Sequence, residues 1–313
     1  MTPVRNLTMI SEIHLLGFHT LPQLNVLLFV LLLLIYYVTI SGNVAIILLV
    51  TCSRSLQSPM YFFLTHLSIS DSLMATSIIP NTLYVVMEDD ANISFVGCLT
   101  QFYFFSASLA LDSLLLSGMS YDRYLAICNP LRYNNIMDYL FCMKFIGFSW
   151  FLSFSVILNH VIAICGLEFC GPNVIDHYFC DLSPLLELSC SDTFIVQIEV
   201  TLLVIPMAFF QFLLVIVSYS YILFTILRIP SVTGRQKAFS TCSSHLTVVS
   251  MYYGTLLCTY LVPTRGQTLT ASKVLSLLYT VVIPCINPII YSFRSKDMKL
   301  LMFRCRYWGT SSS

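Results

Sequence analysis

Charged side chains are scarce in this 313-residue sequence. Asp, Glu, Lys and Arg make up only 10% of the residues, whereas hydrophobic residues make up 57% and the mean hydropathy is +0.83. A soluble domain carries roughly a quarter of its residues as charged side chains. The composition therefore excludes an ordinary soluble protein and predicts a membrane protein.

Charge is nearly absent from long stretches that repeat along the chain. Seven stretches hold no charged residue or a single acid, and each is long enough for the roughly 20 apolar residues of a membrane-crossing helix. They are Ile13–Ser53, Ser55–Met87 (with Asp71), Ala91–Tyr121 (with Asp112), Phe145–Leu167, Val200–Leu227, Ala238–Thr264 and Val274–Phe293. We therefore predict an all-α membrane protein with a bundle of seven transmembrane helices.

Basic residues are shared unevenly between the two sides that seven spans define. One side holds twelve of the fifteen Lys and Arg residues, and the other holds ten of the fifteen acids. Because positive loops stay in the cytoplasm, the amino terminus is predicted outside and the carboxyl terminus inside. The expected layout is one domain, 1–313, with an extracellular segment 1–20, a helix bundle 21–293 and a cytoplasmic tail 294–313 that holds a short amphipathic helix.

The sequence also lacks the marks of several other classes. The first apolar stretch is too long for a cleavable signal peptide and has no small-residue cleavage site. The net charge of zero carries no information on nucleic acid, and no nucleic-acid partner is expected. The absence of an internal repeat or of paired broken helices argues against an ion-coupled transporter or channel. No catalytic set is credible, because His160 and His245 fall at opposite ends of the bilayer, so the protein is not expected to be an enzyme.

Asp122 and Arg123 form an adjacent acid and base at the cytoplasmic end of the third apolar stretch. One interpretation is an interfacial anchor, because an Arg side chain reaches the water boundary at little cost. The other is a switch. Tyr219, His245 and Tyr291 lie at the inner ends of three other spans. An anchor needs no such neighbours, so the switch is favoured.

Polar residues also occur within the spans. A lone buried carboxylate costs at least about 2.5 kcal/mol, so Asp71 and Asp112 need a partner or a function. A structural sodium ion or a shared proton is one interpretation, a neutral hydrogen-bonding acid is the other, and no further cofactor is expected. Asn43 is expected to point into the bundle. Pro288 allows a kink, and Asn287 is available to satisfy the backbone groups that it frees.

The segment Lys237–His245, at the inner end of the sixth span, is rich in small hydroxyl residues. Small residues let helices approach closely, so the segment is either a joint at which helices slide or a tight packing face.

Four cysteines, Cys98, Cys170, Cys180 and Cys190, fall on the extracellular side, where disulfides form. They allow three pairings, and the sequence does not choose among them. A metal pair of His177 and Cys180 is disfavoured, because a disulfide is available to Cys180.

Three candidate modification sites lie near the membrane or the termini. Asn6-Leu7-Thr8 is a glycosylation acceptor pattern on the side predicted to be extracellular. Asn92-Ile93-Ser94 has the same pattern, but its closeness to the bilayer disfavours modification. Cys305 is either acylated or a plain juxtamembrane cysteine.

Several motifs occur in order, each in its own span. They are Gly42-Asn43, Pro59–Leu64 with Asp71, Met119–Cys128 continuing to Tyr133, Ser218-Tyr219, Lys237–His245 and Pro284–Tyr291. Over nearly the whole chain, this set resembles the vertebrate olfactory (odorant) receptors, a branch of the rhodopsin-like (class A) G-protein-coupled receptors. The form of Lys237–Phe239 resembles the terrestrial-type class (class II). The sequence departs at His66, where the family more often carries Asn, and this puts only local packing in doubt.

The resemblance implies roles for single residues. It implies that Cys98 pairs with Cys180 and Cys170 with Cys190, and that sodium binding at Asp71 and Asp112 is possible. It also implies that Asp122 holds Arg123 at rest, and that Arg123 meets the carboxyl-terminal helix of a G-protein α subunit when the bundle opens. The positions that rearrange around Arg123 are Tyr219, His245 and Tyr291, and Asn287 and Pro288 are counted with them among the switch residues.

The function implied is that of a multi-pass plasma-membrane odorant receptor. It is expected to bind a small, volatile, mostly apolar ligand within the helix bundle and to activate a stimulatory, olfactory-type heterotrimeric G protein, which raises cAMP. The alternative is a chemoreceptor of the same fold that acts outside olfaction.

The candidate ligand pocket follows from helical spacing. Steps of three and four residues back from Arg123 define one face of the third span, and the facing stretches of three other spans complete the pocket. An amine ligand is disfavoured, since no acid occupies the outer part of this face. The alternative for each residue is that it only packs the bundle. The candidates are Phe102, Phe105, Ser106, Leu109, Leu203, Val204, Met207, Tyr253, Leu256, Leu257, Tyr260, Leu277 and Thr280.

Overall fold

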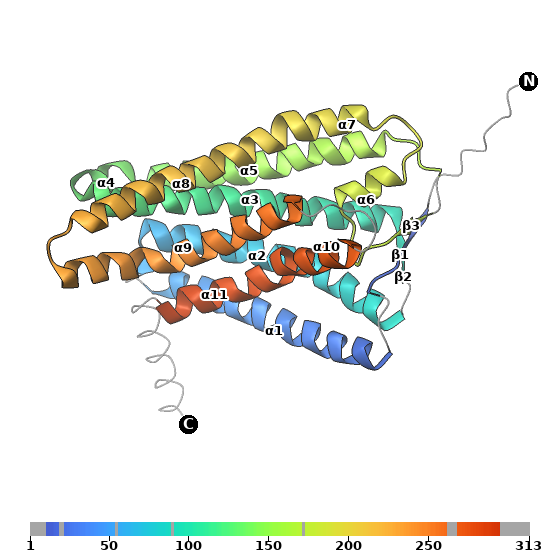
Figure 1. The fold of residues 1–313 in the computed structure, drawn as a ribbon, viewed down its shortest axis with the longest axis horizontal. Coiled ribbons are helices and arrows are strands. Elements are labelled where there is room, and N and C mark those ends of the chain that lie inside the picture. The colour runs from blue at the N-terminus through green and yellow to red at the C-terminus, as the bar shows by residue number, and fades with distance from the viewer. Residues whose placement is uncertain are drawn as a thin grey trace, which may run out of the picture.

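Seven long helical rods lie side by side in the computed structural model (Figure 1), which describes residues 11–18, 22–53, 56–88, 91–170, 173–261 and 268–294. The first four are α1 (Pro22–Cys52), α2 (Pro59–Glu88), α3 (Phe95–Cys128) and α5 (Tyr139–Cys165). The fifth joins α7 (Phe194–Glu199), the π-helix η2 (Val200–Val204) and α8 (Ile205–Arg228); the sixth is α9 (Val232–Leu261); the seventh joins α10 (Thr268–Leu277), the π-helix η3 (Leu278–Val282) and α11 (Ile283–Arg294). Two short helices, α4 (Pro130–Ile136) and α6 (Leu182–Glu187), lie in the connections.

The predicted seven-helix membrane bundle is confirmed. Within the described residues, six rods are long and apolar enough to cross a membrane. The remaining rod, α9, is 30 residues long, but its first turns carry Arg235, Lys237 and a run of hydroxyl residues. Its length matches the others, and only its inner end is polar.

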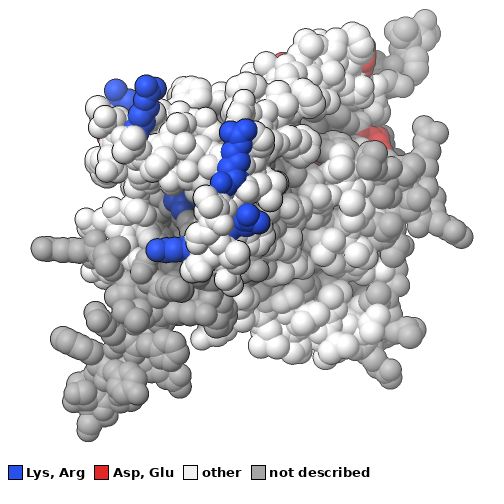
Figure 2. Space-filling view, turned by 60° about the vertical axis from the view of Figure 1, so that its left-hand side comes forward, with Lys and Arg blue, Asp and Glu red and all other residues white. Residues whose placement is uncertain are grey.

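Basic side chains gather at one end of the bundle. Because neighbouring rods alternate in direction, α4, the first turns of α5 and the turn from α8 to α9 lie together (Figure 1). Figure 2 shows Lys and Arg on this end and Asp and Glu toward the opposite one. The distribution is the one expected of a cytoplasmic end. The basic residues in these segments are Arg132, Lys144, Arg228, Arg235 and Lys237.

The opposite, extracellular end carries a small sheet that the sequence did not predict. Its strand order is β2-β1-β3. Strand β1 (Glu12–Leu15) pairs antiparallel with β2 (Ala91–Ser94) and parallel with β3 (Val174–Ile175). Ile13 and Leu15 of β1 are fully buried. Residues 11–18, which precede the first span, are thus a packed part of the fold.

Local signals explain where several helices begin. Ser94 caps α3 by accepting a hydrogen bond from the Gly97 amide, and Asp138 caps α5 by accepting one from Phe141. Pro59 opens α2 at the Ser58-Pro59 start that the sequence indicated.

Some predictions fall on residues outside those described. They are the glycosylation site at Asn6, the amphipathic helix of the tail beyond residue 294, and Cys305.

Candidate functional site

The cytoplasmic end of α3 carries a buried ion pair. Asp122 is fully buried and Arg123 is 9% exposed. The Arg123 Nε donates to Asp122 Oδ2 at 2.8 Å, and Nη2 donates to the same oxygen. Tyr133 of α4 donates its hydroxyl to Asp122 Oδ1 at 2.8 Å. Burial and the Asp122 charge raise the pKa of Tyr133, so its hydroxyl keeps its proton and goes on donating. The carboxylate is therefore held from two sides.

Three further rods bring aromatic rings to this ion pair. Tyr219 of α8 and His245 of α9 are buried, and the Tyr219 hydroxyl lies 2.6 Å from His245 Nδ1. The Arg123 charge acts on both rings. Tyr291 of α11 is 2% exposed, and its hydroxyl has no hydrogen-bond partner among the described residues. The charges of Arg123 and Asp71 both act on it, so Tyr291 lies between the inner cluster and the middle of the bundle.

The middle of the bundle holds two buried carboxyl groups. Asn287 donates its amide to both oxygens of Asp71, at 3.2 and 2.9 Å. Asp112 is 4% exposed, and its charge acts on Asp71. The Asp112 Oδ1 and the Ser108 hydroxyl oxygen have no hydrogen-bond partner among the described residues. No group of three or more His, Cys, Asp and Glu side chains in the described part of the chain forms a metal site.

A residue of another helix supplies the hydrogen bond that proline removes from the seventh rod. Pro288 has no N–H to donate to the carbonyl of Pro284. Asn43 of α1 donates its amide to that carbonyl at 3.3 Å. The expectation that Asn287 satisfies the freed backbone group is therefore wrong, because its amide is engaged by Asp71. Gly42 permits the close approach, since a Cβ there would lie 3.1 Å from the Pro288 ring.

At the extracellular end, the structure contains the two disulfides that the family resemblance implies. Cys98 is joined to Cys180 with a Cα–Cα distance of 5.5 Å, and Cys170 to Cys190 with 5.9 Å. The first bond ties the segment between α5 and α7 to α3. Because Cys180 is in a disulfide, it is not a metal ligand with His177.

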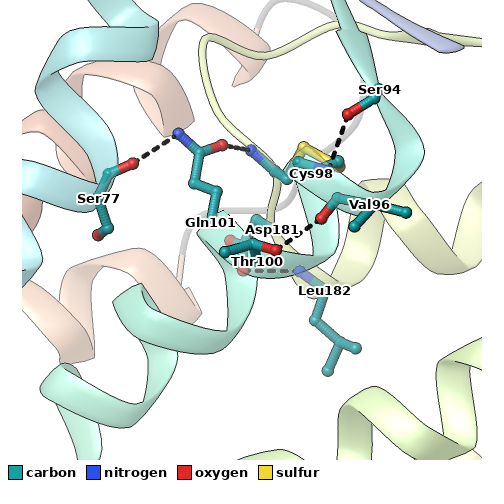
Figure 3. The surroundings of a disulfide bond; sticks show 10 residues. Ser77, Ser94, Val96, Cys98, Thr100, Gln101, Asp181 and Leu182 are labelled. Atoms are coloured by element: carbon teal, nitrogen blue, oxygen red, sulfur yellow. Dashed lines mark hydrogen bonds between the residues drawn. A yellow bond between two sulfur atoms is a disulfide. The ribbon is translucent and has the colours of Figure 1, made fainter.

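A buried amide supports this attachment (Figure 3). The Gln101 Oε1 accepts from the Cys180 amide at 2.9 Å, and its Nε2 donates to the Ser77 carbonyl at 3.1 Å. Just beyond, Asp181 accepts from the Leu182 amide at 2.7 Å, while burial raises the pKa of Asp181. The extracellular segment is thus fixed to α2 and α3 by side-chain contacts as well as by the disulfide.

Two aromatic residues that the sequence reasoning missed lie next to the predicted pocket. Tyr178 and Phe179 are both fully buried. The Tyr178 hydroxyl lies 3.1 Å from the Thr280 hydroxyl, and the Phe179 ring lies 5.1 Å from the Phe105 ring, centroid to centroid. In the sequence they are visible only as an aromatic pair directly before Cys180. The pair lies beside the predicted pocket residues because Cys180 is bonded to Cys98 of α3.

Most predicted pocket residues are buried or half-buried. Phe102 is buried beside the disulfide, Thr280 is buried at Tyr178, and Ser106, Val204 and Met207 are half-buried. The side chain of Tyr260 lies outside those described. Phe105 belongs to a large buried apolar cluster that also contains Tyr178 and Phe179 and runs through the bundle, and Leu109, Tyr253, Leu256 and Leu277 pack against it.

Two predicted pocket residues lie elsewhere. Leu203 is 48% exposed and Leu257 is 56% exposed, so neither packs in the interior cluster. Leu203 belongs to the π-helix η2, and its prediction came from a facing stretch without any helical counting in that span. Leu257 follows Leu256 in α9 and lies next to Cys258, which is also exposed, so its side chain is on the outer side of that helix.

Seven helical rods, a disulfide between α3 and the extracellular segment, and an Asp122–Arg123 pair among aromatic rings at the cytoplasmic end define a class. It is the class of rhodopsin-like G-protein-coupled receptors.

Comparison with known proteins narrows the class to a family. A family model described as olfactory receptor matches residues 32–306, and the chain belongs to the olfactory receptor family. It is 42% identical over 295 residues to olfactory receptor 1M1 of Mus musculus, covering 94% of both chains. It is 45% identical over 300 residues to olfactory receptor 10A4 of Homo sapiens, covering 96% of this chain and 95% of the other.

Membership of this family confirms the main functional predictions. The protein is an odorant receptor of the plasma membrane that crosses the bilayer several times, and it acts through a G protein. The family is one of receptors and not of enzymes. Odorant, G protein and lipid bilayer are accordingly its partners.

Proposed function

We propose that this receptor binds a small, volatile, weakly polar odorant in the outer half of the bundle and activates a stimulatory, olfactory-type G protein, which raises cAMP. The observation that most directly supports the proposal is the buried Asp122–Arg123 ion pair, to which the Tyr133 hydroxyl donates a hydrogen bond. With the guanidinium held by its neighbour, the receptor is in its resting state. Activation frees Arg123 to meet the carboxyl-terminal helix of the G-protein α subunit.

One rod connects the pocket to this ion pair. The Tyr252 hydroxyl of α9 donates to the Leu109 carbonyl of α3 at 2.7 Å, at the level of the pocket. Two helical turns further in, His245 of the same rod contacts Tyr219. An odorant that favours a shifted α9 therefore acts on both contacts. Such coupling is typically about 1–3 kcal/mol and equals the difference in odorant affinity between the two states.

The pocket side chains favour an uncharged ligand. Phe105, Leu109 and Leu256 are apolar, and the polar groups nearby are the hydroxyls of Thr280 and Tyr253. No carboxylate lies on the outer part of the α3 face, so nothing there would balance the charge of an amine.

A sodium ion fits the middle of the bundle. Two carboxyl groups and a hydroxyl supply hard oxygen ligands, and the Asp112 Oδ1 and the Ser108 oxygen are unpartnered among the described residues. Asp71, Asp112 and Ser108 would hold the ion, which would balance negative charge in a low-dielectric interior.

The experiment expresses the receptor with an olfactory stimulatory G protein and measures cAMP against an odorant panel, with surface staining. We expect a concentration-dependent response that Arg123→Ala abolishes. A silent panel with verified surface receptor, or a response that Arg123→Ala leaves intact, contradicts the proposal. Responses only to non-volatile compounds would favour a chemoreceptor acting outside olfaction. An odorant-dependent current without added G protein would favour a transporter or channel.

A further inference from the structure

A buried ammonium joins three distant segments at the extracellular end. Lys273 of α10 is only 6% exposed. Its Nζ donates to the Gly17 carbonyl at 2.6 Å and to Asp176 Oδ1 at 2.5 Å. The segment before α1, the segment after α5 and the seventh rod therefore meet at one side chain.

The backbone conformation at Gly17 allows this contact. Its φ is +57°, a conformation that L side chains rarely adopt, and an added Cβ would lie 2.8 Å from Val85 Cγ1. Glycine at this position lets the chain turn beneath β1 and present its carbonyl to Lys273.

The two extracellular segments form one lid, which we define as Glu12–Phe18 together with Val174–Cys180. Strand β1 pairs with β3 inside it, and the Phe18 ring stacks on the Tyr178 ring at 5.1 Å. Figure 1 shows these strands across the end of the bundle.

Among the described residues, the lid has one covalent attachment and one ionic one. The disulfide from Cys180 to Cys98 fixes it to α3. On the side of the seventh rod, Lys273 supplies the ionic contact to Asp176. The Lys273 ammonium is buried and needs its partners. The Asp176 side chain is 44% exposed, so water can hydrate it when the lid moves away from Lys273. The ionic attachment is therefore the one that can open.

The lid's inner side chains contact residues that the sequence predicted to line the pocket. Tyr178 and Phe179 are fully buried and contact Thr280 and Phe105, two residues that the sequence placed in the ligand site. The ring of His177, which is also buried, contacts both. The position of the lid thus sets the outer limit of the pocket.

We propose that Lys273 is a positioning residue: through Asp176 and the Gly17 carbonyl it holds Tyr178 and Phe179 as the outer wall of the odorant site, where both contact the odorant. The odorant contact rests on the proposed function, whereas the closure of the lid by Lys273 does not.

The first experiment measures lid closure without any odorant. Phe105→Cys places a thiol beneath Phe179, in a background with Cys165→Ser and Cys258→Ser, since those two free thiols are exposed. A membrane-impermeant thiosulfonate reagent is applied from outside, and the rate of modification is measured. Lys273→Met and Asp176→Asn should each raise the rate by about tenfold, a modest value because Asp176 is partly solvated.

Three further variants separate the contact from general damage. The double variant Lys273→Met/Asp176→Asn should react no faster than Lys273→Met alone, because that change already removes both contacts of the ammonium, with Asp176 and with the Gly17 carbonyl. Lys273→Arg should react like wild type, as should Glu187→Gln, which removes an exposed carboxylate of the same extracellular segment. Equal rates in wild type and in both single variants, with normal surface staining, overturn the proposal.

The second experiment uses an odorant that activates the wild-type receptor. Lys273→Met should raise the half-maximal concentration by about tenfold with the maximal response retained. Tyr178→Leu and Phe179→Leu should change the rank order of odorants, which a merely structural role would not. An unchanged rank order in both overturns the contact with odorant. If no odorant activates the wild type, the proposed function fails, while the thiol rates still decide lid closure.

Discussion

Asn43 donates a hydrogen bond to the backbone carbonyl of Pro284, across the interface between the first and seventh rods. Pro288 cannot supply the helical N–H that this carbonyl would otherwise accept. The Asn43 amide also donates to the Thr39 carbonyl at 3.0 Å, so the contact is made from a fixed side chain. The hydrogen bond that Pro288 removes from α11 is thus replaced by one from a residue in another helix.

Asn43→Ala should destabilise the receptor by about 1–3 kcal/mol, because the Pro284 carbonyl loses its donor inside the bundle. The measurement is the Tm of detergent-solubilised receptor. Ser41→Ala is the matched control, since Ser41 is exposed on the same helix and its hydroxyl donates only to backbone of that helix. Equal Tm values for the two variants would show that the contact contributes nothing.

Gly118→Ala should destabilise the bundle by about 1–3 kcal/mol through overpacking. A Cβ at this position in α3 would lie 2.6 Å from the Phe145 ring of α5 and 3.0 Å from Phe63 of α2. Gly147→Ala is the control, since a Cβ there meets nothing within 4 Å. The Tm of both variants is compared with that of the wild type. A wild-type Tm for Gly118→Ala would mean that the Phe145 and Phe63 rings can move aside without cost.

Asp122→Asn should raise the basal cAMP signal by roughly tenfold. The variant lacks the charge that holds Arg123, and the stabilisation that the resting state loses is comparable to the coupling free energy between the two states. Tyr133→Phe should raise it less, since it removes one hydrogen bond to the carboxylate and leaves the ion pair. Tyr139→Phe is the control, a tyrosine near α4 whose side chain is 72% exposed. Basal cAMP per surface receptor is the measurement. An unchanged basal signal in Asp122→Asn would contradict the resting-state role of the pair.

Acid should loosen the lid through His177. Burial, and then the Lys273 ammonium, lower its pKa from 6.5 to about 3, against the opposing effect of Asp176. The unfolded lid therefore binds more protons between these values, so stability is full above pH 6.5 and falls as pH drops. At pH 5 the loss is about 2 kcal/mol by linkage.

Hydrogen exchange of Val174–Cys180, corrected for the intrinsic pH effect, checks this loss. Exchange should be faster at pH 5 than at pH 7 in wild type and nearly independent of pH in His177→Asn. His14→Asn, which changes an exposed histidine of the same lid, should keep the wild-type dependence. Equal pH dependence in wild type and His177→Asn would exclude His177 as the cause.

The number of spans follows from the sequence alone, because run length and charge are properties of the chain in one dimension. Uncharged stretches such as Phe145–Leu167 need no partner to be identified as membrane helices. The family resemblance is also local, since each motif is read within a single span. The directions of single side chains were predicted less well: Leu203, expected inside the bundle, is exposed, and no pattern in the sequence indicates the π-helix η2 that contains it.

Only the tertiary structure decided which polar groups meet. From the sequence, Asn287 was expected to satisfy the backbone group that Pro288 frees. In the packed structure Asn43 donates to that group, and Asn287 donates to Asp71 instead. The segment before the first span was predicted to be a tail, yet Glu12–Leu15 is a strand in a sheet with two distant loops. The physical reason is the same in each case. A membrane helix is specified by its own residues, whereas a buried hydrogen bond or ion pair, such as that of Lys273 with Asp176, depends on which segments packing brings together.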